Sequence, residues 1–143
     1  MTDRVLLDTN VLIAAVDRDR PGHLAARRLV ESDPRALAIT GQNLREFLVA
    51  LTRPRANDGY GQTGPTAVAY WSEVSATLDS VEETRASRQL LASLVAGEKA
   101  VGKQVHDANL VAVAIEHGAR AIVTASPRHF ARFADLIEIE ALN

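Results

Sequence analysis

The stretch VLLDTNVLIAAV, residues 5–16, places a single charged residue, Asp8, between two apolar segments. Residues 5–7 are apolar without polar alternation, a pattern typical of a strand that is buried on both faces. Residues 11–16 are apolar again and favour a short helix. Asp8 therefore lies between two elements that we expect to be buried, and a charge at that point needs a reason.

The rest of the chain repeats this order of short apolar strands and helices. Further strands are expected at residues 36–40, 78–82, 120–124 and 136–142, and helices at 20–32, 42–53, 66–78, 83–98 and 106–118. Residues 54–65, PRANDGYGQTGP, are expected to be irregular because they hold three glycines and two prolines. The alternation predicts an α/β fold, a single domain over residues 1–143 with a mostly parallel central sheet covered by helices.

The composition excludes several classes of protein. Of the 143 residues 47% are hydrophobic and 24% charged, which is ordinary for a globular protein. The net charge of −2 gives no overall basic character, so nucleic acid would be bound through a local patch or metal ions. The absence of cysteine excludes disulfides and zinc–thiolate sites and fits a cytoplasmic location. We identify no signal peptide after the N-terminal MTDR, and no apolar stretch reaches the roughly 20 residues of a membrane helix.

Asp8 and Asp107 each have a structural and a functional interpretation. Ligands bind at the carboxyl ends of the strands of a parallel sheet, where Asp8 and Thr124 are expected, but aspartate is also common in turns and helix caps. Asp107 lies in the first turn of a helix, where the helix dipole stabilises an acid by about 0.3–1 kcal/mol. It also stands at the head of the buried stripe of that helix, which favours function. The local sequence leaves both interpretations of Asp8 open.

Glu46 is the third acidic candidate. The main apolar stripe of its helix contains Leu44, Phe47, Leu48 and Leu51, so periodicity alone favours a solvated face for Glu46. Carboxylates that are brought together repel one another unless a cation is present. Oxygen ligands without cysteine favour Mg²⁺ or Mn²⁺, and the chemistry that such a site implies is hydrolysis of a phosphate ester.

The order of these segments resembles the PIN-domain nucleases. LLDTNVLI resembles the first motif of that family, ITGQNLREFLVALTRP the second, and HDANLVAVAIEHGARAIVTASPRHFARF the third and fourth. The likeness runs from about residue 4 to the C-terminal end and is greatest to the VapC-type toxins of bacterial toxin–antitoxin pairs. It implies a three-layer α/β/α PIN-like sandwich.

The resemblance also implies an activity, a cofactor and partners. The activity is Mg²⁺- or Mn²⁺-dependent endoribonuclease cleavage of tRNA, rRNA or mRNA, and the partners are a VapB-type antitoxin and a second copy of the chain, with no membrane. Asp8, Glu46 and Asp107 match the family's first three acidic positions, so they are the implied catalytic residues. Asp8 and Asp107 would hold the metal, and Glu46 would assist in binding metal or orienting water.

Ser126 is a departure from the family pattern, since many members place Asp or Asn there. A serine supplies no charge, so a second metal ion is in doubt, and we expect Ser126 to cap a helix that begins at Pro127. Thr124 is expected to hydrogen-bond Asp8 or a water, and Asn10 to orient the site.

Basic residues near the acids are candidates for RNA phosphate contacts. These candidates are Arg45, Lys103, Arg128 and His129. His106 and His129 could be general bases, but the four histidines show no paired spacing, so water activated by metal is preferred. Two alternatives remain at this point: a phosphatase that forms an aspartyl-phosphate on Asp8, and a PIN-like binding module for RNA or protein with a weakened metal site.

Overall fold

The computed structural model describes residues 3–143. Met1 and Thr2 lie outside the described residues, and they belong to the N-terminal segment in which no signal peptide is expected. The described residues form one five-stranded parallel sheet in the order β3-β2-β1-β4-β5. The strands are β1 (Arg4–Leu7), β2 (Ala36–Thr40), β3 (Asp79–Val81), β4 (Ala121–Thr124) and β5 (Glu138–Ala141). The α-helices are α1 (Thr9–Val16), α2 (His23–Ser32), α3 (Gly41–Thr52), α4 (Gly64–Ser75), α5 (Arg85–Ala96), α6 (Gln104–Glu116) and α7 (Pro127–Phe130). The α/β fold and the parallel sheet predicted from the sequence are confirmed.

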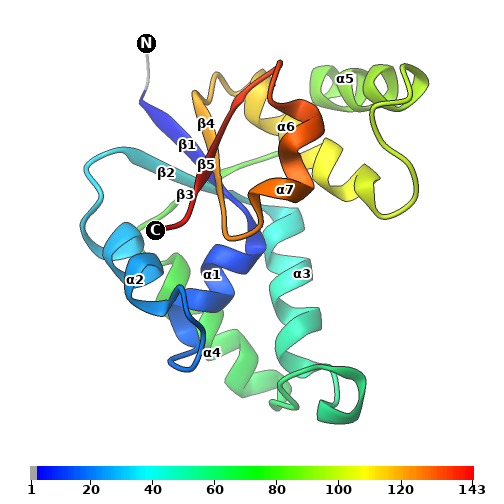
Figure 1. The fold of residues 1–143 in the computed structure, drawn as a ribbon. Helices are drawn as coiled ribbons and strands as arrows, with labels where there is room; N and C mark the ends of the chain where they lie inside the picture. Colours follow the sequence, from blue (N-terminus) through cyan, green and yellow to red (C-terminus); the bar gives the residue numbers. More distant parts are fainter. Residues whose placement is uncertain (1–2) are drawn as a thin grey trace.

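Helices cover both faces of the sheet, which makes three layers (Figure 1). Val5 and Leu7 of the central strand point into a core formed with α1 to α4, and Leu6 points into a second core formed mainly with α5 to α7. All three side chains are fully buried, and each such burial contributes about 1.5–3 kcal/mol. The unbroken apolar run at residues 5–7 is therefore explained by burial on both faces of β1.

Several helix boundaries differ by a few residues from the sequence prediction. Helix α1 begins at Thr9 rather than at residue 11, because Asp8 serves as its N-cap residue. Helix α4 includes Gly64 and Pro65, since Thr63 caps it and a proline fits the first helical turn. The irregular segment also contains a 3₁₀ turn at Arg55–Asn57, and α7 continues into a second at Ala131–Phe133.

The start of α3 is tied to the end of β2 by a reciprocal pair of hydrogen bonds. The Thr40 hydroxyl accepts from the backbone N–H of Asn43 at 3.2 Å, and the Asn43 side chain accepts from the backbone N–H of Thr40 at 2.8 Å. Such a capping box satisfies two backbone donors at the start of a helix. The contact fixes how α3, which carries Glu46, leaves the carboxyl edge of the sheet.

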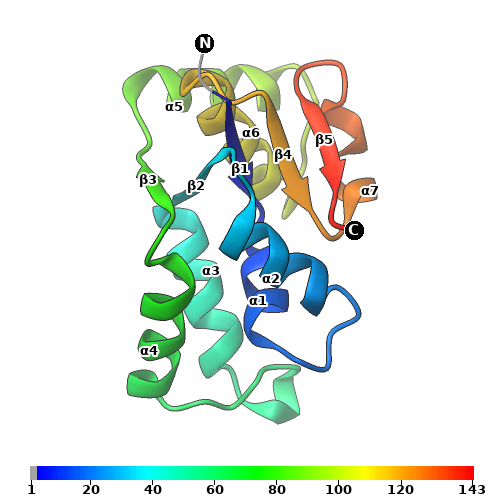
Figure 2. The ribbon, with the colours of Figure 1, turned by 90° about the vertical axis from the view of Figure 1, so that its left-hand side faces the viewer.

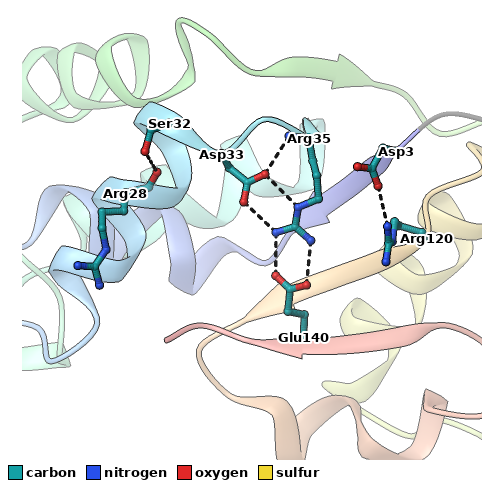
Figure 3. A network of polar contacts seen from close by, with 7 residues as sticks. All are labelled: Asp3, Arg28, Ser32, Asp33, Arg35, Arg120 and Glu140. Atoms are coloured by element: carbon teal, nitrogen blue, oxygen red, sulfur yellow. Dashed lines mark hydrogen bonds and ion pairs between the residues drawn. The ribbon is translucent and has the colours of Figure 1, made fainter.

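A polar network links the end of α2, the start of β2 and strand β5 (Figure 3). Arg35 donates to both carboxylate oxygens of Glu140 on β5, at 2.8 and 2.9 Å, and also to Asp33 beside it. This bidentate contact joins the start of β2 to the edge strand β5, and the Arg35 hydrogen bonds hold the pKa of Asp33 below its usual value. A cleft of about 410 Å³ lies beside it, lined in part by Arg28 and Asn143.

Within residues 3–143, no helix has both the length and the apolar character needed to cross a membrane.

Candidate active site

Asp8 is held at the carboxyl end of β1 by contacts to two neighbouring elements. One carboxylate oxygen accepts a hydrogen bond from the backbone N–H of Thr9 at 2.8 Å. The other accepts from the hydroxyl of Thr124, at the end of the adjacent strand β4, also at 2.8 Å. Thr124 is fully buried, and the backbone N–H of Asp8 donates to Val123 at 2.9 Å. The predicted contact between Thr124 and Asp8 is confirmed, and Asp8 proves to be both a helix cap and a carboxylate at the edge of the sheet.

Burial and nearby acids raise the pKa of Asp8. The pKa of Asp8 is raised from 3.8 to about 6, and burial is the largest cause. The negative charges of Asp107 and Glu46 act in the same direction, while the hydrogen bonds from Thr124 and the Thr9 backbone oppose the shift. Three carboxyl groups from β1, α3 and α6 therefore lie close enough to influence one another.

Glu46 faces the site and not the solvent. One of its carboxylate oxygens accepts from the Thr9 hydroxyl at 2.7 Å, and the other from the Gln42 side chain at 3.3 Å. The side chain is half-buried, whereas Val49 on the same helix is 56% exposed. The interpretation of Glu46 as part of a solvated face is wrong, because the polar side of α3 is covered here by the start of α1.

Asp107 lies in the first turn of α6, as expected, and is half-buried. Burial is the main cause that raises its pKa, and Glu46 acts in the same direction. The charges of His129, Arg132 and His106 oppose this shift. Asp107 is thus influenced both by the acid Glu46 and by a group of basic residues.

Asn10 joins the start of α1 to the turn after β4. Its side-chain oxygen accepts from the backbone N–H of Ala125 at 3.1 Å, and its nitrogen lies 3.4 Å from the Thr124 hydroxyl and 3.3 Å from the Ser126 hydroxyl. Ser126 is the N-cap residue of α7 and Pro127 follows at the first turn, as predicted, but the Ser126 side chain makes no capping hydrogen bond. That part of the prediction is wrong because the Ser126 hydroxyl turns towards Asn10.

The PIN domain family matches residues 5–136 of this sequence. The chain belongs to the PIN domain family. No curated protein matches it in a comparison of sequences.

Solved structures share the fold. A chain of the DNA-bound VapBC complex from Salmonella typhimurium is similar with a TM-score of 0.70 and 22% identity, over 100% of each chain. A chain of VapBC2 from Rickettsia felis, bound to a promoter DNA fragment, has a TM-score of 0.69 and 16% identity over 98% of this chain and 99% of its own. VapC20 from Mycobacterium tuberculosis, described as a toxin that cleaves the sarcin–ricin loop, has a TM-score of 0.63 and 23% identity over 82% of this chain and 86% of its own.

The basic residues whose charges act on Asp107 in this PIN domain match only in part those expected for RNA contacts. Arg45, Lys103 and Arg128 are exposed on α3, before α6 and on α7. The charges that act on Asp107 come from His129, which was among the candidates, and from Arg132 and His106, which were not. Arg132 lies over the ring of Phe133 at 6.0 Å, and its buried Nε has no hydrogen-bond partner among the residues that the structure describes. Nothing in the sequence around Arg132 distinguishes it from other arginines.

Several polar residues of the site were missed from the sequence. Thr9 contacts Glu46, and Asn43, which is 1% exposed, donates to the Leu7 carbonyl at 3.1 Å and to the Thr9 hydroxyl at 3.0 Å. Gln42 and Asn109 are also buried beside the acids. The spacing of Gln42 four residues before Glu46, on one face of a helix, is the signal that could have identified it.

The donor set of this PIN domain fits a hard divalent cation held by few protein ligands. Among residues 3–143, no group of three or more His, Cys, Asp or Glu side chains forms a ready-made metal cluster. Mg²⁺, however, typically takes one or two carboxylates from a protein and completes its shell with water and phosphate. Within residues 3–143, the hydrogen bonds that Asp8 accepts come only from neutral donors, and burial and two further acids raise its pKa. A cation at Asp8 and Asp107 would therefore relieve the repulsion.

Proposed function

We propose that this PIN domain is an Mg²⁺- or Mn²⁺-dependent endoribonuclease and the toxin of a toxin–antitoxin pair. The observation that carries the proposal is the convergence of Asp8, Glu46 and Asp107 from three elements on one edge of the parallel sheet, where the pKa of Asp8 is raised to about 6. The similarity to VapC20, described as cleaving the sarcin–ricin loop, supports structured RNA as the substrate class.

Asp8 and Asp107 are the residues that would hold the cation. When bound, a divalent cation supplies Lewis-acid chemistry, which lowers the pKa of water and stabilises charge on phosphoryl oxygens. Thr124 and the Thr9 backbone hold the two oxygens of Asp8 in fixed directions. Both donors are neutral, so they do not cancel the negative charge of ionised Asp8, and that charge remains available to attract a cation.

Glu46 is placed to orient a water molecule or accept its proton. Each of its oxygens accepts one hydrogen bond, from Thr9 and from Gln42, so the carboxylate keeps further lone pairs for a ligand. Arg132 contributes positive charge near Asp107, which would favour an RNA phosphate at this position.

Partner and location form part of the proposal. The similar VapBC structures support a VapB-type antitoxin as the partner. Exposed apolar side chains on α2, α3 and α4 offer surface for that antitoxin or for a second copy of the chain; they are Leu24, Val49, Val68 and Tyr70. A cytoplasmic location fits a ribonuclease without cysteine.

Cleavage of RNA by the purified chain tests the proposal. Wild type is expected to cut a structured RNA in Mg²⁺ or Mn²⁺ and to stop in EDTA, whereas Asp8→Asn and Asp107→Asn are expected to lose at least a hundredfold in rate with an unchanged circular dichroism spectrum. An exposed control, Asp19→Asn, is expected to cleave like wild type. Wild-type rates in either site variant would contradict the assignment of these acids, and a phosphorylated Asp8 trapped with a phosphate ester would favour a phosphatase instead.

A further inference from the structure

Gln42 contacts both helices that carry the second and third acids. Its side-chain nitrogen donates to a Glu46 carboxylate oxygen on its own helix α3, at 3.3 Å. The same nitrogen donates to the backbone carbonyl of His106 on α6, at 2.8 Å. His106 immediately precedes Asp107, so one amide group spans from Glu46 to the backbone beside Asp107.

This contact crosses between two layers of the molecule. Phe47 and Leu51 of α3 pack in the core on one face of the sheet, while Leu110 and Val111 of α6 pack in the core on the other. The sheet separates these cores, so apolar packing does not set the distance between α3 and α6 directly. At the edge of the sheet, the hydrogen bonds of Gln42 link α3 directly to α6.

Asn109 determines which way the Gln42 amide points. Its side-chain nitrogen donates to the Gln42 oxygen at 2.7 Å and to the Glu83 carboxylate at 3.1 Å. A carboxylate only accepts hydrogen bonds, so Glu83 fixes the nitrogen end of Asn109, which in turn takes the oxygen end of Gln42. The nitrogen end of Gln42 is thereby left to face Glu46. Gln42 and Asn109 are 6% and 9% exposed, so water competes little for these groups.

From these contacts we infer that Gln42 and Asn109 are positioning residues that set the orientation of Glu46 and its spacing from Asp107, with Glu83 fixing the direction of the chain of amides. The inference rests on the proposed function, because the geometry that these residues maintain is that of the proposed metal and water site. None of the three residues need touch the RNA or the cation. Outer partners of this kind typically change metal affinity or activity by about 10- to 100-fold when they are removed.

Glu83→Lys tests the direction of the amide chain without removing a buried group. Glu83 is exposed, so the variant is expected to fold. A lysine is only a donor, and it favours reversal of both amides, which turns the Gln42 oxygen towards the Glu46 carboxylate. The matched control is Glu82→Lys, an exposed neighbour with the same change of charge. Binding of Mn²⁺ to the purified chain without RNA, followed by electron paramagnetic resonance, is expected to weaken at least threefold in Glu83→Lys beyond any effect in Glu82→Lys.

Gln42→Met and Asn109→Leu remove the amides while keeping similar volumes. We expect Mn²⁺ affinity to fall by about tenfold in Gln42→Met and by less in Asn109→Leu, with kcat for RNA lowered and KM unchanged. Gln62→Met is the control, since Gln62 lines a different cleft beside Tyr60. If Gln42→Met does not fold, the comparison of Glu83→Lys with Glu82→Lys decides the question.

Two results would overturn the inference and separate it from the proposed function. A wild-type chain that binds Mn²⁺ and cleaves RNA, together with Gln42→Met and Glu83→Lys variants that match their controls, overturns the positioning role alone. A wild-type chain that neither binds Mn²⁺ nor cleaves RNA overturns the proposed function and this inference with it.

Discussion

Asp8 is expected to make the metal-free protein less stable as the pH rises. Its pKa is 3.8 without the fold and about 6 within it, so between these values the folded chain binds the proton more tightly than the unfolded chain does. The free energy of unfolding therefore falls as the pH rises through this window, by up to about 3 kcal/mol, and stays lowered above it.

Asp8→Asn is expected to remove most of that dependence. In EDTA at pH 7.5 the variant should be more stable than wild type towards urea, while at pH 4 the two should be nearly equal. Some slope will remain, because the pKa of Asp107 is raised as well. Asp19→Asn serves as the exposed control, and an Asp8→Asn protein that is less stable than wild type at pH 7.5 would contradict the raised pKa.

At the scale of the elements, Asn43 connects three of them. It completes the capping box of α3 with Thr40 and donates to the end of β1 and the start of α1. Asn43→Ala leaves these buried groups unpaired and is expected to cost about 2–4 kcal/mol in the free energy of unfolding. RNA cleavage should also fall, because Thr9 loses the donor that orients its hydroxyl beside Glu46.

Ser87→Ala is the matched control for this prediction. Ser87 forms the same kind of capping box with Thr84 at the start of α5, is fully buried, and is not among the contacts of the acids. The variant is expected to lose about 1 kcal/mol in urea unfolding and to cleave RNA normally. Equal loss of cleavage in the folded fractions of both variants would show that capping alone, and not the position of Thr9, accounts for the effect.

The elements were predictable from the sequence to different degrees. The buried strand at residues 5–7 and its parallel neighbours follow from unbroken apolar runs, and the acids at strand and helix ends follow from the order of the elements. The direction in which Glu46 points could not be predicted, because the periodicity of one helix cannot show which other element covers its polar side. The orientation of the Ser126 side chain could not be predicted for the same reason, since its partner Asn10 lies 116 residues away in the sequence.

On the scale of the whole molecule, the strand order β3-β2-β1-β4-β5 gathers residues from distant parts of the chain at one edge (Figure 2). β1 supplies Asp8, the adjacent β4 supplies Thr124, and β2 leads into the helix of Glu46. The sheet is built from parallel strands, so all their carboxyl ends lie on the same side. The acids are thus brought together by the fold at an electrostatic cost, and a ligand that neutralises them should stabilise the fold as a whole.

Mn²⁺ is therefore expected to raise the thermal unfolding temperature of the purified chain. A ligand that binds only the folded state at a hundred times its Kd adds about 2.7 kcal/mol, which corresponds to a rise on the order of 10 °C for a chain of this size. Protons compete for Asp8 near its pKa of about 6, so the rise should be large at pH 7.5 and much smaller at pH 5. Scanning calorimetry with Mn²⁺ or EDTA at both pH values measures it, and Asp8→Asn should abolish the rise. An equal rise at both pH values, or one that persists in Asp8→Asn, would place the stabilising ion elsewhere than at this edge of the sheet.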